Sequence, residues 1–107
     1  MKYAVMANLS FSTPALRDNL DQAIKARILG KPTWGTIGMV KGTDLEGRPS
    51  HGLEIRFNNK ADKDNLYPFI KSLMDTLPVV KGKVSWHECS HDESPPRPCQ
   101  IAESYER

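Results

Sequence analysis

The sequence lacks a long apolar run, and this argues against a membrane-spanning helix. No stretch approaches the roughly 18 consecutive apolar residues that such a helix needs, and no basic segment followed by an apolar one resembles a secretory signal. Cysteine is also scarce, with 2 in 107 residues, which is too few for a secreted disulfide scaffold. We therefore expect a cytoplasmic protein without a membrane partner.

The sequence also lacks a dominant charge. Its 15 Lys and Arg residues are nearly balanced by 13 Asp and Glu residues, for a net charge of +2, and the two signs alternate along most of the chain. Because proteins that bind nucleic acid usually concentrate basic residues in a patch or stripe, we expect no nucleic-acid partner. The length fits one domain. The apolar fraction of 38% is below the usual ~45–50%, which favours a thin two-layer architecture helped by a partner.

The first third of the chain predicts a strand and then a helix. Residues 2–11 alternate between apolar and polar, which is the pattern of a half-buried strand. Thr13 is a good N-cap, and Pro14 fits the first helical position because its missing N–H has no partner there. An apolar stripe with spacings of three and four follows. Gly30 and Pro32 are typical of the end of such a helix.

The middle of the chain repeats the strand and helix pattern in a different order. We expect a second strand at 33–40, a loop at 41–51, a third strand at 52–58, a helix within 60–77 and a last strand at 79–89. Pro68 lies in the first turn if Asn65 caps the second helix, and would kink the helix if it begins earlier.

The end of the chain has a different composition. Residues 1–91 read as a single α+β domain, and residues 92–107 read as a proline-rich polar C-terminal tail. Pro95, Pro96 and Pro98 favour an extended path over packing.

The order strand-helix-strand, twice, joined by a hairpin, is the ferredoxin-like βαββαβ arrangement. Right-handed crossovers place both helices on one face of a four-stranded antiparallel sheet, with spatial order 4-1-3-2. The other face then has no cover. Many unrelated functions use this architecture, so the fold alone does not decide the activity.

The alternation also predicts which side chains the uncovered face carries. They are Ala4, Met6 and Asn8, then Trp34, Thr36, Gly38 and Val40, then Glu54 and Arg56, and finally Lys83, Ser85 and His87. Met6, Trp34 and Val40 are more apolar than a solvated face needs. They indicate either a sheet-to-sheet homodimer or a ligand surface, although scattered exposed apolar groups are also normal.

A cluster near the C-terminus predicts a possible zinc site. His87 and Cys89 are two residues apart on a strand, so both side chains point to one side and could chelate one ion. His91 joins them only if the strand turns near Ser90, and Cys99 then returns as a fourth ligand. Two Cys and two His would make a closed structural site, although the spacing matches no standard zinc finger.

Other interpretations of these residues remain open. Cys89 and Cys99 could form a disulfide, which a reducing cytosol disfavours. Cys89 could instead be a reactive thiol beside protonated histidines, or both cysteines could be unremarkable. In the loop at 41–51, Arg48 and His51 could together hold an anion, or simply belong to a solvated polar connection.

Three functions are consistent with these features. The first is a binding or assembly module, homodimeric through its uncovered sheet face. The second is a small metalloprotein that uses the His/Cys cluster. The third is a small dimeric α+β barrel enzyme for a small organic molecule, with its pocket between sheet and helices lined by Asn8, Trp34, His51 and His87. No nucleophile motif, phosphate loop or dinucleotide fingerprint favours catalysis.

Overall fold

A computed structural model of the chain describes residues 2–28, 34–90 and 97–107, with side chains at all of these except 34–37, 90 and 97–99. The elements are β1 (Tyr3–Phe11), α1 (Pro14–Ile28), β2 (Trp34–Thr43), β3 (Pro49–Phe57), α2 (Lys60–Thr76), β4 (Val79–Ser90) and β5 (Arg97–Glu106). The first six follow the predicted order. Within the described residues, no helix is long and apolar enough to cross a membrane.

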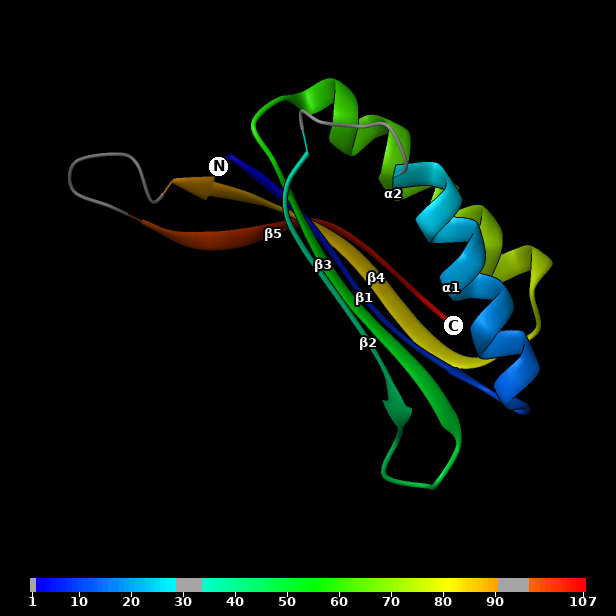
Figure 1. Cartoon of the computed structure of the whole chain (residues 1–107). Coiled ribbons are helices and arrows are strands. Elements are labelled where there is room, and N and C mark those ends of the chain that lie inside the picture. Colours follow the sequence, from blue (N-terminus) through cyan, green and yellow to red (C-terminus); the bar gives the residue numbers. More distant parts are fainter. Residues whose placement is uncertain (1, 29–33, 91–96) are drawn as a thin grey trace.

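The strands form one antiparallel sheet in the order β2-β3-β1-β4-β5. Both helices lie on the same side of this curved sheet (Figure 1). The predicted α+β architecture and the order 4-1-3-2 of the first four strands are therefore confirmed. The prediction of a four-stranded sheet is wrong, because β5 adds a strand to the outer edge of β4.

Strand β5 forms where the sequence predicted an unpacked tail. It pairs with β4 through Val84↔Tyr105 and Lys83↔Glu106, among other positions. The outer edge of β4 offers unpaired backbone N–H and C=O groups, which an extended segment can satisfy whatever its side chains. An edge strand need not be apolar, and Pro98 is tolerated near its beginning. Because its side chains are mostly polar, the sequence pattern did not predict that this segment forms a strand.

The hydrophobic core lies between the sheet and the helices. Central strand β1 contributes alternate residues to it, and its Val5 pairs with Ile55 of β3 and with Trp86 of β4. The fully buried large apolar side chains are Val5, Leu9, Phe11, Leu20, Ile24, Ile55, Phe57, Leu66, Ile70, Met74 and Val84. Leu53, Ile55 and Phe57 all belong to this core, as predicted for the third strand.

The opposite side of the sheet is here called the open face. Its side chains are Ala4, Met6, Asn8 and Ser10 of β1, with the residues directly opposite them on neighbouring strands: Arg56, Glu54, Gly52 and Ser50 on β3; His87, Ser85, Lys83 and Lys81 on β4; and Gly38, Val40, Gly42, Ile101, Ser104 and Glu106 on the outer strands. No helix covers these side chains among the described residues (Figure 1).

The local sequence signals account for most element ends. Thr13 caps α1, because its hydroxyl accepts the Leu16 N–H at 3.3 Å. Helix α2 begins at Lys60, before Asn65, so Pro68 lies inside the helix. Strands β2 and β3 extend into the predicted loop and leave only residues 44–48 as the turn between them.

A substitution at Gly82 tests how β4 packs against β1. An added Cβ there would collide with Leu9 Cδ2 and lie 3.1 Å from Val79 Cγ1. Leu9 is buried and cannot easily move. We expect Gly82→Ala to lower the free energy of unfolding by about 1–3 kcal/mol, the usual cost of overpacking, as measured by urea denaturation.

Gly52→Ala is the matched control, because a Cβ on Gly52 meets nothing within 4 Å. It should change the stability by less than about 0.5 kcal/mol. Equal stability of the two variants would show that β4 does not pack on β1 as described.

Candidate functional site

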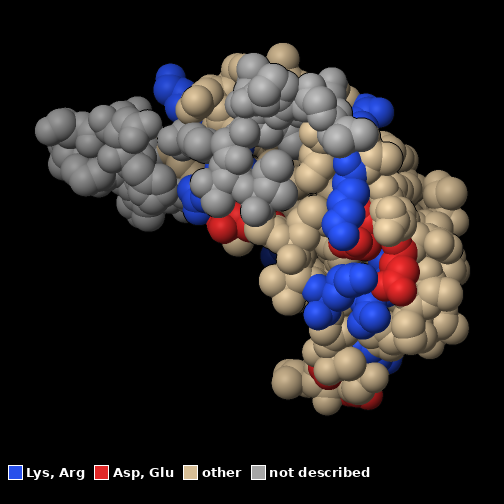
Figure 2. Space-filling model, viewed as in Figure 1, with Lys and Arg blue, Asp and Glu red and all other residues tan. Residues whose placement is uncertain are grey.

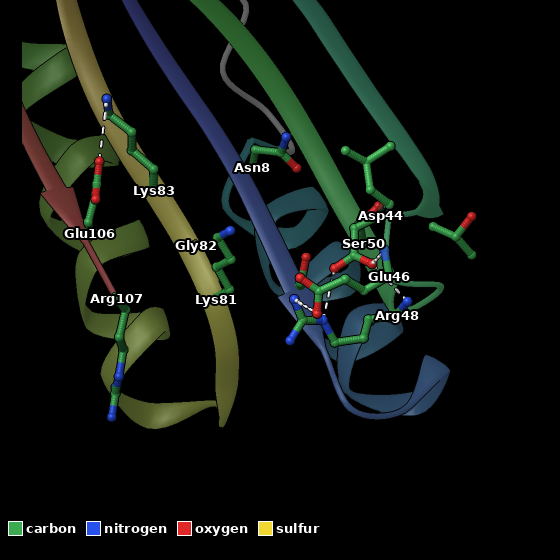
Figure 3. Close-up of a pocket in the computed structure, with 13 residues that line it drawn as sticks. Asn8, Asp44, Glu46, Arg48, Ser50, Lys81, Gly82, Lys83, Glu106 and Arg107 are labelled. Atoms are coloured by element: carbon green, nitrogen blue, oxygen red, sulfur yellow. Dashed lines mark hydrogen bonds and ion pairs between the residues drawn. The ribbon is translucent and has the colours of Figure 1, made fainter.

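The open face contains two adjoining hollows that share Asn8 and Lys83. The larger has a volume of about 610 Å³ and the smaller about 320 Å³. Asn8 and Ser50 come from β1 and β3 at the middle of the larger hollow, Lys81 and Lys83 border it from β4, and the turn at 44–48 borders it on the other side (Figure 3). Side chains from four separate segments therefore meet here.

The turn at 44–48 is held together by Asp44. One carboxylate oxygen accepts the backbone N–H groups of Glu46 and Arg48, both at 2.9 Å. The other accepts Arg48 Nε at 3.0 Å. Gly47 adopts a φ of 81°, which glycine tolerates without strain. The Asp44 carboxylate thus satisfies two backbone N–H groups and one arginine N–H of its own turn.

Charges within this turn are also compensated. Arg48 pairs with Asp44 and, through its other nitrogen, with Glu46 at 2.9 Å. Burial alone would raise the pKa of the Asp44 carboxyl, but hydrogen bonds from the Arg48 backbone, the Ser10 hydroxyl, the Arg48 side chain and the Glu46 backbone hold that pKa far below its usual range. The bond to Ser10 of β1 ties the turn to the open face.

The opposite border of the hollow is basic. Lys81 and Lys83, here called the lysine pair, lie on the same side of β4 because they are two residues apart. Lys83 Nζ lies 3.6 Å from Glu106 Oε1 of β5. Lys81 forms no ion pair within the described part of the chain. This border therefore offers at least one uncompensated positive charge.

Beyond the lysine pair, the same side of β4 carries a Ser–His pair. Ser85 Oγ lies 2.9 Å from His87 Nε2. Burial lowers the pKa of the His87 imidazole below its usual value, Arg56 and Lys83 lower it further, and Glu54 opposes them. The ring is therefore neutral at pH 7, and a neutral imidazole nitrogen can accept a hydroxyl proton.

The structure brings together some of the predicted site residues. Met6 and Asn8 lie at the two hollows, Val40 is exposed on the same face, and Arg48 belongs to the turn that borders the larger hollow. The side chain of Trp34 lies outside the described residues.

His51 lies elsewhere, contrary to the suggestion that it and Arg48 hold an anion. Its ring faces the helices and is fully buried. His51 Nε2 lies 2.9 Å from Asp21 Oδ1 of α1, while Lys25 Nζ lies 2.7 Å from the other oxygen. The one-residue step from Ser50 to His51 turns the imidazole to the covered side of the sheet.

Sequence reasoning did not identify Asp21 as the partner of His51. Burial would raise the pKa of the Asp21 carboxyl, but hydrogen bonds from Lys25 and His51 lower it overall. Asp21, Ile24 and Ile28 are spaced by three and four, so a signal existed: a carboxylate on the buried stripe of a helix requires a buried polar partner.

The predicted zinc site does not form among the described residues, in which no group of three His, Cys, Asp or Glu side chains could hold a metal. Cys89 is disulfide-bonded, and the only other cysteine in the chain is Cys99. A sulfur in a disulfide offers no thiolate to zinc. His91 and the side chain of Cys99 lie outside the described residues.

The sequence matches no family model and no curated protein. Among solved structures, the chain is similar to a candidate antibiotic biosynthesis monooxygenase from Deinococcus radiodurans. The TM-score is 0.53 at 13% sequence identity, and the alignment covers 78% of this chain and 88% of the other. Likeness at this identity establishes the shared α+β fold, with two helices on an antiparallel sheet, and does not transfer an activity.

The environment of His87 predicts how its ring titrates. Because the pKa is lowered from the ordinary value of 6.5, any stability that depends on the neutral ring is complete above pH 6.5 and is lost as the pH falls through the lower, folded-state pKa. We expect the His87 ring signals in an NMR titration to show a midpoint below 6.5.

Arg56→Gln should raise this midpoint, because it removes a nearby positive charge and leaves the carboxylate of Glu54. Lys60→Gln, at the beginning of α2, is the control and should leave it unchanged. A wild-type midpoint above 6.5 would contradict the described environment.

Proposed function

We propose that this protein is a homodimeric binding module of the small α+β barrel type, in which the open faces of two copies pack against each other. The observation that carries the proposal is the contrast between the two sides of the sheet. One side is covered by both helices (Figure 1), whereas the other exposes 38% of Met6, 69% of Val40 and 57% of Ile101. Exposed apolar groups that share one face are typical of an interaction surface.

The size of the open face is sufficient for a stable interface. Five strands at a spacing of about 4.8 Å, each about nine residues long at about 3.4 Å per residue, span roughly 700 Å². A standard interface buries about 800 Å² per partner. A single copy of the sheet therefore supplies nearly the whole area that such a dimer needs.

The relief and charge of the open face favour a second copy of the same surface. Ala4 of central strand β1 and Gly52 of neighbouring β3 carry little or no side chain on this face, so longer side chains of a partner can approach there. Glu54 and Glu106 lie on the same face as Lys81 and Lys83, so a two-fold axis can place opposite charges against each other. Figure 2 shows that Lys or Arg side chains and Asp or Glu side chains also lie next to each other elsewhere on the surface of the protein.

A second candidate function is a small enzyme, and the similarity to a candidate monooxygenase favours it. The pocket predicted between sheet and helices is not supported, because buried side chains fill that region. The hollows of the open face offer another place for a substrate. His87 does not line either hollow, but its ring contacts Ser85, which lines the smaller one, so the imidazole could act as a general base beside that hollow.

Dimerisation is tested by placing a charge at the centre of the open face. We expect Met6→Glu to dissociate the dimer, because the carboxylate would be buried without a partner. Sedimentation velocity should report twice the chain mass for the wild type and one chain mass for the variant. Ala61→Glu, on the exposed first turn of α2, is the control and should remain dimeric. A wild type that is monomeric at all concentrations would contradict the proposal.

Oxygen uptake tests the enzyme candidate. With hydroquinone as an electron-rich small phenol, we expect uptake that His87→Gln reduces by about 100-fold, the typical contribution of a general base. Ser104→Ala, on the neighbouring strand, is the control and should retain the rate. Equal uptake by wild type and His87→Gln would remove this candidate.

A further inference from the structure

The larger hollow has the dimensions of a small-molecule site. Its volume of about 610 Å³ falls within the roughly 300–1,000 Å³ of known ligand pockets. The turn at 44–48 forms one border and the lysine pair forms the other, with Asn8 between them (Figure 3). All of these groups belong to one chain, so the site does not require a second copy.

The charges that remain available in the hollow are positive. Asp44 and Glu46 are occupied by Arg48 and by backbone N–H groups of their own turn. Glu106 compensates Lys83, with 3.6 Å between its Oε1 and Lys83 Nζ. Lys81 forms no ion pair with any residue that the structure describes. An anion placed between the two lysines would therefore meet uncompensated positive charge.

The polar group of Asn8 adds a directional donor. Its side chain is exposed at the middle of the open face and forms no hydrogen bond within the described residues. An amide N–H₂ can donate to the same anionic group that the lysines attract. The arginines at this hollow are already engaged, Arg48 with the turn and Arg107 with Asp75 and the Met74 carbonyl. The bidentate fork that favours phosphate is therefore not available.

Apolar side chains lie at the turn border of the hollow and in the adjoining hollow. Leu45 projects fully exposed from the turn, and Met6 lines the adjoining hollow. Gly52 has no side chain and leaves the passage between the two hollows low. A ligand that fills this space needs an apolar body as well as an anionic end.

We infer that the open-face hollow binds a small organic anion with an apolar body, such as an aryl carboxylate, whose charged end lies between Lys81 and Lys83. Asn8 donates a hydrogen bond to the same end, and the ring lies toward Met6 in the adjoining hollow. In the proposed dimer, the second sheet would cover the ligand. The inference goes beyond dimerisation, because one chain supplies every group named here.

NMR titration with 2-naphthoate tests this inference. We expect amide shifts at Asn8, Ser50 and Gly82, and a dissociation constant below about 1 mM, the weak end of specific binding. The double variant Lys81→Met, Lys83→Met should bind at least about tenfold more weakly, because it loses both charges and keeps the apolar stems. Lys60→Met is the control and should bind like the wild type.

Two further probes separate the contributions with the wild-type chain alone. Neutral 2-naphthamide should bind at least about tenfold more weakly than 2-naphthoate because it lacks the charge, and inorganic phosphate should also bind more weakly because it lacks the apolar body. Equal binding of either probe, equal binding by the double variant, or shifts confined to the helices would overturn the inference.

Sedimentation of the same samples distinguishes this result from the dimer. A monomeric chain that binds 2-naphthoate at these residues would support the ligand site and remove the dimer. A dimeric chain that does not respond to 2-naphthoate would support the dimer and remove the ligand site.

Discussion

The alternation of side chains along β1 is the constraint on which the rest of the structure depends. This strand is central and pairs with β3 on one side and β4 on the other. Val5, Leu9 and Phe11 enter the core, while Met6 and Asn8 reach the open face. Because the period is two residues, a slip by one position would exchange the buried and the exposed sets. The register of β1 against β3 and β4 therefore determines both which side chains form the core and which side chains form the candidate site.

The same division separates two kinds of polar group. On the covered side, His51 and Asp21 pair inside a packed layer and Lys25 reaches the carboxylate from the surface. Breaking the pair would leave a costly buried charge, and His51 Nδ1 is buried without a hydrogen-bond partner among the described residues. On the open face, Lys81, Lys83 and Asn8 lie where a ligand or a second sheet can reach them. The polar groups that a ligand can reach therefore lie on the open face, whereas the fully buried histidine, His51, lies on the covered side.

Much of the fold could be predicted because it depends on local periodicity. The alternating strands, the Thr13 cap and the apolar helix stripes indicate their elements directly, and chain topology then restricts the sheet order. Strand β5 could not be recognised in this way, because its pairing depends on the backbone edge of β4 and hardly on its own side chains. The pairing of Asp21 with His51 requires knowledge of how α1 lies on β3, which short-range patterns do not contain.

From the sequence, only the face of the sheet that carries the candidate site could be predicted. Alternation placed Met6, Asn8, Lys83 and Ser85 together, but the hollow itself depends on the turn at 44–48, which is tied to β1 through Asp44 and Ser10. That contact joins residues far apart in the sequence. The disulfide of Cys89 likewise depends on the path of the chain after β4, so composition alone could not choose between zinc and sulfur as its partner.

The accessibility of the Met6 methyl group to a soluble paramagnetic chelate, followed by NMR as the protein is concentrated, tests the central claim most directly. We expect strong relaxation of this methyl in dilute solution and protection at high concentration, while the buried methyl of Met74 stays protected throughout. Strong relaxation of the Met6 methyl at every concentration would contradict the pairing of open faces, and protection even in the dilute monomer would contradict the open face itself.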